Sequence, residues 1–136
     1  MPPSLHDKME SLNYREPVFA GSDETLREVA HALWVENVGA LVVGAPAHAQ
    51  GMISERDLVA QLAQGADVDA VTAGEAMTTN LVAARAGDTL GDGAYQMLDG
   101  AIRHLPVVDG EGHVVGMVSV RDLLRPLLSG GPDGPG

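Results

Sequence analysis

The chain has 136 residues, enough for one compact domain, whereas either half alone would be only marginally stable, so we expect the halves to share a core. Its 8 lysines and arginines against 19 aspartates and glutamates give a formal charge of −11, which disfavours nucleic acid as a partner. The absence of cysteine excludes disulfides, thiolate metal sites and a cysteine nucleophile. No apolar run is long enough to span a membrane and no signal-peptide pattern begins the chain, so we expect a cytoplasmic protein with no membrane partner.

The first half predicts a strand, a helix, two strands and a second helix. The apolar period places the strand at 18–20 and the helix from Leu26 to Asn37, with Ser22 or Asp23 as its cap. A buried strand at 40–43, a turn at 44–46 and a strand at 51–54 follow. The second helix is expected at 58–64, with Leu58, Val59 and Leu62 on one face.

The second half repeats this order. The segment 51–59 returns as 116–124, which is 65 positions further along (116 − 51). A strand at Val82, a helix over 90–102, a strand at 105–108, a turn at 109–112, a strand at 114–118 and a helix over 123–128 are predicted. The fold class is therefore α+β, with two β-α-β-β-α motifs forming one pseudo-two-fold domain.

The repeat also predicts the organisation of the chain. We expect an N-terminal extension at 1–12, a first motif at 13–66, a linker at 67–76 and a second motif at 77–128. The last residues, 129–136, are rich in glycine and proline and predict a disordered tail.

Each half carries the same polar motif just before a predicted apolar helix. Ser54 and Asp57 stand three residues apart, and Ser119 and Asp122 repeat the arrangement. This is the spacing of a capping box, so helix capping alone explains both pairs. The same helix N-terminus can also receive a phosphate, and an ionised aspartate can accept both hydroxyl protons of a ribose diol. The residues alone leave both interpretations open.

The two Gly-hydrophobic-hydrophobic-Ser-x-Arg-Asp-Leu signatures in register, with Met77-Thr78 and the run 105–109, resemble the tandem CBS-domain pair, also called the Bateman module. The resemblance covers residues 13–128 and is to small stand-alone bacterial CBS proteins, some of them linked to stress or hypoxic responses. It implies a regulatory module and no enzyme. The module would bind AMP, ADP, ATP or S-adenosylmethionine in a cleft between the motifs, need no cofactor, form a homodimer and act on an unidentified protein.

Carried over residue by residue, the resemblance implies contacts to an adenosine-containing ligand in a second cleft from Thr79, Asn80, Val82, Arg103, His104, Pro106, Ser119, Arg121 and Asp122. In a first cleft it implies contacts from Val18, Ser54, Arg56 and Asp57. The second cleft is the stronger prediction, because the first half has Gly39-Ala40 where the second has Arg103-His104. We expect Arg15 to supply part of the charge that the first cleft lacks.

Three classes of function stay open, and the enzyme is the weakest. No Ser-His-Asp order, paired-carboxylate constellation or glycine-rich phosphate loop is visible, so no catalytic residue is predicted. The five histidines show no close pair, and no metal site is predicted. A ligand-free dimeric scaffold is the alternative to the sensor, because one chain could not cover all of its last apolar cluster, Leu123, Leu124, Leu127 and Leu128. Trp34 is expected in the core.

Overall fold

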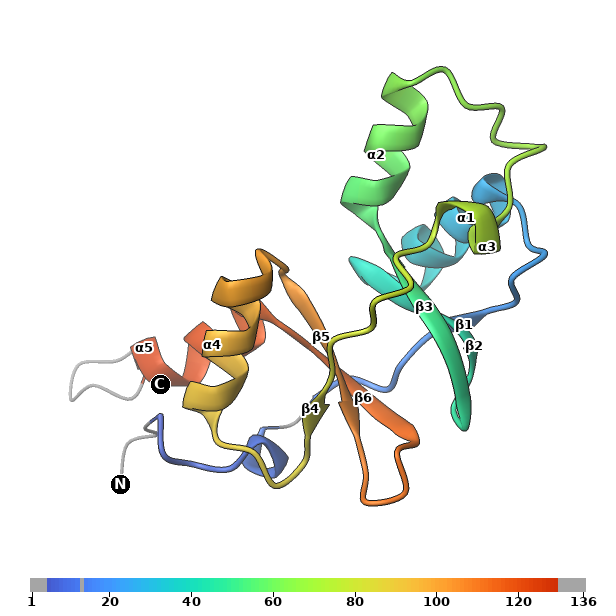
Figure 1. The fold of residues 1–136 in the computed structure, drawn as a ribbon. Coiled ribbons are helices and arrows are strands. Elements are labelled where there is room, and N and C mark those ends of the chain that lie inside the picture. Colours follow the sequence, from blue (N-terminus) through green and yellow to red (C-terminus); the bar gives the residue numbers. More distant parts are fainter. Residues whose placement is uncertain (1–4, 13, 130–136) are drawn as a thin grey trace. The chain divides into compact units, whose positions relative to one another are not determined.

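The computed structural model describes residues 5–12 and 14–129, without the side chains of residues 127 and 129, and forms two compact units (Figure 1). One unit runs from Pro17 to Leu81, and we call it the 17–81 unit. The other joins the chain up to Glu16 to the chain from Val82 onward, and we call it the 82–129 unit. The expected disordered tail lies outside the described residues, except for Ser129, which ends the last helix.

Each unit is built on a three-stranded sheet. The elements of the 17–81 unit are β1 (Phe19–Ala20), α1 (Leu26–Glu36), β2 (Ala40–Ala45), β3 (His48–Ser54), α2 (Glu55–Ala63) and α3 (Ala73–Ala76). Those of the 82–129 unit are the 3-10 turn η1 (Met9–Ser11), β4 (Ala84–Arg85), α4 (Leu90–Gly100), β5 (His104–Val108), β6 (Val114–Ser119) and α5 (Val120–Ser129). In both sheets the first strand is parallel and the last antiparallel to the central strand. The predicted α+β class and the repeated element order are confirmed.

Several predicted bounds were wrong by a few residues. β2 continues through Ala45, so the turn before β3 is confined to residues 46 and 47. α2 begins at Glu55, not Leu58, because its first turn is polar and the apolar period that predicted it starts later. On α2 only Leu58 packs against the core, while Val59 and Leu62 are exposed.

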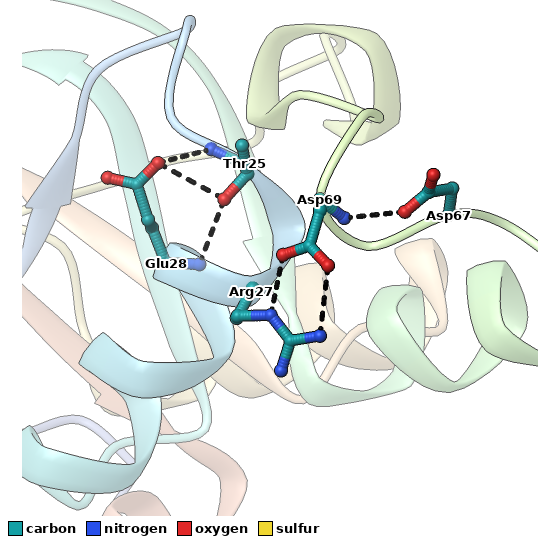
Figure 2. A network of polar contacts seen from close by, with 5 residues as sticks. All are labelled: Thr25, Arg27, Glu28, Asp67 and Asp69. Atoms are coloured by element: carbon teal, nitrogen blue, oxygen red, sulfur yellow. Dashed lines mark hydrogen bonds and ion pairs between the residues drawn. The ribbon is translucent and has the colours of Figure 1, made fainter.

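The N-terminus of α1 is capped by Thr25, not by Ser22 or Asp23 as expected, because the helix starts only at Leu26. Thr25 Oγ1 accepts a hydrogen bond from the Glu28 N–H at 3.2 Å, and Glu28 Oε1 accepts one from the Thr25 N–H at 3.1 Å (Figure 2). In the same helical turn, Arg27 Nε and Nη2 donate to the two carboxylate oxygens of Asp69, at 2.6 and 3.0 Å (Figure 2). This bidentate pair ties the start of α1 to the chain that follows α2.

Each unit contains a hydrophobic cluster of its own, whereas we expected one core for both halves. The cluster of the 17–81 unit comprises Ala20, Leu26, Val29, Leu33, Leu41, Val43, Ile53 and Ala73. That of the 82–129 unit comprises Met9, Ala84, Leu90, Met97, Leu105, Val107, Val118 and Leu123. Each cluster also contains a residue from outside the expected motifs, Ala73 from the expected linker and Met9 from the expected N-terminal extension. These residues enlarge cores that the motifs alone would leave small.

The segments that precede the two halves are exchanged between them. The Met117 N–H donates to Arg15 O at 3.0 Å, so the segment before the first half lies along β6 of the second. The Met52 N–H likewise donates to Thr78 O at 3.0 Å, so the segment before the second half lies along β3 of the first. The family-motif boundaries stay a prediction, but the compact units follow this exchange and not the expected ranges 13–66 and 77–128.

Glycine is required where the exchanged segments cross the sheets. A Cβ built on Gly116 would lie 2.2 Å from Cδ2 of Tyr14, and one built on Gly51 would lie 2.5 Å from Thr78 O. Both distances are far inside van der Waals contact, so only glycine permits the approach. The repeated glycine at the start of each signature motif thus has a structural reason.

The N-terminal segment is also held at the start of α4. The Leu90 N–H donates to Asp7 O and the Gly91 N–H to Leu5 O, both at 2.8 Å, while the Met9 N–H donates to Asp88 O at 2.6 Å. These bonds satisfy helix N–H groups that have no partner within the helix. Residues 5–12 and 14–16 are therefore a part of the 82–129 unit.

Some large apolar residues lie outside both cores. Trp34 is 85% exposed, so its expected place in the core was wrong, and Leu98 at the equivalent position of α4 is 82% exposed. On α5, Leu123 is buried but Leu124 and Leu128 are exposed, as their clustering predicted. Within residues 5–12 and 14–129, no helix is long and apolar enough to cross a membrane.

Candidate functional site

The strand order brings most of the predicted ligand contacts of each unit to one end of its sheet. β4 and β5 are parallel, so they begin at the same end, and the antiparallel pairing of His104 with Ser119 places the end of β6 there too. The 17–81 unit repeats this arrangement, with Ala40 paired to Ser54. We call the end formed by Val82, Arg103, His104, Pro106, Ser119, Arg121 and Asp122 the second site. The first site is formed by Val18, Ser54, Arg56 and Asp57.

The capping interpretation of the polar motif is confirmed. In the first site the Ser54 N–H donates to Asp57 Oδ2 at 2.8 Å, and the Asp57 N–H donates to Ser54 Oγ at 3.3 Å. In the second site the corresponding bonds of Ser119 and Asp122 are 2.8 and 3.1 Å. Each aspartate uses only its Oδ2 in these bonds. Because each carboxylate has a second oxygen, capping and ligand binding are compatible.

The two sites differ in positive charge. Arg103 and Arg121 are exposed in the second site, next to the half-buried His104, and neither arginine forms an ion pair within the described part of the chain. The first site has Gly39 and Ala40 in place of Arg103 and His104, so Arg56 is its one arginine of the motif. The backbone of Arg15 pairs with Met117 in the other unit, so the charge expected from Arg15 in the first site stays a prediction. On a chain of net charge −11, the second site is the better place for an anion.

Pro106 creates a second difference between the sites. In the 17–81 unit the Val42 N–H donates to Val18 O at 2.9 Å, which holds the approach to β1 against β2. Pro106 occupies the equivalent place in β5 and has no N–H, so this bond cannot form with Val82 O. For the same reason the predicted strand at Val82 was wrong, and β4 starts only at Ala84. The Val82 carbonyl is left without that donor.

Thr79 and Asn80 are exposed and belong to the 17–81 unit, so their assignment to the second site stays a prediction. The residues that the structure describes contain no group of three or more histidines, aspartates or glutamates that could hold a metal ion. Gln96 of α4 was not predicted, although its amide contacts the segment that leads into β4. The first half has Ala32 at this position, and that difference between the repeats was the available signal.

A family model described as the CBS domain matches residues 73–129. The CBS domain-containing protein YhcV of Bacillus subtilis is 34% identical over 102 residues, which are 74% of this chain and 71% of that protein. The chain belongs to the CBS-domain family. Three other curated relatives are longer, and the match spans between 54 and 63% of their length.

Two solved CBS structures share the fold over nearly their full length. The CBS domain protein PAE2072 from Pyrobaculum aerophilum, complexed with AMP, is 30% identical with a TM-score of 0.78, and the match covers 88% of this chain and 97% of that one. The CBS domain pair of protein MJ0100, in complex with 5′-methylthioadenosine and S-adenosyl-L-methionine, is 28% identical with a TM-score of 0.78. There the match covers 87% of this chain and 93% of that one. The present chain is thus a CBS pair in fold.

Proposed function

We propose that this CBS pair is a regulatory module that binds an adenine nucleotide or another adenosine-containing ligand in its second site. AMP, ADP, ATP and S-adenosylmethionine are the candidates. The proposal is supported by two similar CBS structures, of which one holds AMP and the other two adenosine compounds. The proposed role is binding, with no catalytic step and no required cofactor.

The main support for the proposal is that the carbonyl oxygen of Val82 receives no hydrogen bond from β5. Because Pro106 cannot donate to it, this oxygen can accept a hydrogen bond from the amino group of an adenine ring. The half-buried side chain of Val82 supplies apolar surface for the ring itself. In the first site, Val18 O already accepts from Val42, so the same contact is opposed there.

The rest of the second site suits a ribose and a phosphate. Asp122 Oδ1 can accept from the ribose hydroxyls while Oδ2 keeps its bond to the Ser119 N–H. The N-terminus of α5 presents its positive dipole end, and Arg103 and Arg121 add charge to receive phosphate. Binding would regulate a partner protein by favouring one of two arrangements of the chain, for which a coupling of about 1 to 3 kcal/mol is sufficient.

Thermal unfolding with and without AMP tests this proposal, with Asp122→Ala and Asp57→Ala as a matched pair. Both variants lose the same kind of capping bond, so both should lose about 1 kcal/mol of stability. At about 100 times its Kd, AMP should stabilise the wild type and Asp57→Ala by about 2.7 kcal/mol, but not Asp122→Ala. Equal stabilisation of both variants, or no shift with AMP, ADP, ATP or S-adenosylmethionine, would contradict the proposal.

A homodimeric scaffold that binds no ligand is the second candidate. It is favoured by apolar residues exposed at equivalent positions of the two helix pairs, Trp34 and Val59 on α1 and α2, and Leu98 and Leu124 on α4 and α5. Such paired exposure is typical of an interface between protein chains. A homodimer is also compatible with the sensor, and we propose that the sensor acts as one. If no adenosine compound binds, the capping bonds alone account for the Ser-x-x-Asp motif and the scaffold is favoured.

A further inference from the structure

Gln96 is a polar residue on α4, and only one of the two polar groups of its side-chain amide forms a hydrogen bond. Its Nε2 donates to Ala83 O at 3.3 Å. Its Oε1 is buried and has no hydrogen-bond partner among the described residues. A buried acceptor without a donor destabilises the folded state, whereas an apolar side chain of similar shape avoids this cost. Stability alone therefore does not explain a glutamine at this position.

The hydrogen bond from Gln96 reaches Ala83, next to Val82, whose carbonyl receives no strand hydrogen bond from Pro106. Residues 82 and 83 lead into β4, and the proline at position 106 removes the N–H that would fix them to β5. In the 17–81 unit, where Val42 supplies that N–H, the residue equivalent to Gln96 is Ala32, which has no donor in its side chain. The glutamine thus accompanies the missing bond, and it holds the segment from α4.

We infer that Gln96 is a positioning residue of the second site, which fixes the Ala83 peptide so that the neighbouring Val82 carbonyl faces the amino group of the base. This inference rests on the proposed adenine-nucleotide function. It predicts that Gln96 makes the second site prefer 6-aminopurine over 6-oxopurine nucleotides, because a 6-oxo group cannot donate a hydrogen bond to the Val82 carbonyl. Gln96 acts through the backbone and does not need to touch the ligand.

Titration calorimetry with AMP and IMP tests the inference on the wild type, Gln96→Leu and Gln96→Glu. Both substitutions remove the donor to Ala83 O, and the second keeps the shape of the side chain. AMP affinity should fall about tenfold in both variants while IMP affinity changes little, so the preference for AMP is lost. Gln64→Leu on the exposed end of α2 makes the same chemical change elsewhere and should alter neither affinity.

The stability of the variants separates positioning from a structural role. Gln96→Leu also removes the unsatisfied Oε1, so its unfolding temperature should equal or exceed that of the wild type. Unchanged AMP affinity in both variants, or an equal loss of AMP and IMP affinity, would overturn the inference and leave the proposed function intact. If the wild type binds neither nucleotide, the proposed function fails and the inference fails with it.

Discussion

The ion pair between Arg27 and Asp69 gives the stability of the 17–81 unit a dependence on pH. The hydrogen bond from Arg27, aided by its positive charge, holds the pKa of Asp69 below the usual value of about 3.9 (Figure 2). A carboxylate with a lowered pKa in the folded state stabilises that state above its usual pKa, and this contribution is lost as the pH falls through the lowered value. Both side chains are well exposed, so the effect is expected to be small.

Asp69→Asn should therefore flatten the loss of stability between pH 5 and about pH 3, which urea unfolding at a series of pH values would measure. Arg27→Gln removes the other half of the same pair and should flatten the curve to a similar extent. High salt should weaken the difference between the wild type and both variants. An acid profile that neither substitution changes would show that the pair does not contribute.

The roles of single residues in the candidate site were only partly predictable from the sequence. The spacing of Ser119 and Asp122 predicted a capping motif, and the structure confirms its bonds. The missing strand bond at Val82 could have been predicted from Pro106, since proline has no N–H. The predicted burial of Trp34 was wrong because the hydrophobicity of a side chain does not show whether the same chain provides a surface to cover it.

Among the elements, the end of α4 carries a conformational strain that can be measured. Ala101, the C-cap residue, has φ 52° and ψ 40° in the left-handed region, where the side chain of alanine is disfavoured. α1 ends in the same conformation at Asn37, a residue that tolerates it. Both helices therefore end in the same left-handed conformation, but Ala101 is less suited to it than Asn37.

Ala101→Gly should raise the free energy of unfolding by about 0.5 to 1 kcal/mol, because glycine adopts positive φ without steric cost. Denaturant unfolding of the wild type and the variant measures this difference directly. Ala60→Gly in the middle of α2 is the matched control, and it should lose about 1 kcal/mol. A destabilising effect of Ala101→Gly would mean that the left-handed cap is not a source of strain.

The elements themselves were mostly predictable, and their partners were not. Apolar periodicity predicted the helices best where one face is buried, as in α1 with Leu26, Val29 and Leu33, whereas α2 has no fully buried residue. The exchange of the preceding segments left no local signal. Tyr14 packs on Gly116 and Met77 on Gly51, and such contacts between distant positions depend on tertiary structure rather than on a repeating pattern.

For the whole molecule, the exposed apolar helix faces predict a homodimer. Light scattering after size exclusion should give twice the mass of one 14.1 kDa chain for the wild type. Trp34→Glu combined with Leu98→Glu should give the monomer mass, because each substitution places a charge at a highly exposed apolar position. Val115→Glu on β6 changes an exposed apolar residue outside these helices and should leave the mass unchanged. A wild-type monomer would contradict the proposed dimer.

The two halves of the molecule share a fold but differ in the groups that could bind a ligand. The repeat gives both units the same fold and the same capping motif, but only the second half has Pro106, which leaves Val82 O without a strand donor, and Arg103. We propose that these differences let the second half alone bind an adenine nucleotide. The first half has a closed strand bond and no such charge.

Calorimetric titration of the wild-type chain with AMP tests this claim most directly, because it measures affinity and stoichiometry together. We expect one AMP to bind per chain. Two equivalent sites per chain would contradict the difference between the halves, and the absence of binding by AMP and the other adenosine ligands would contradict the proposed function itself.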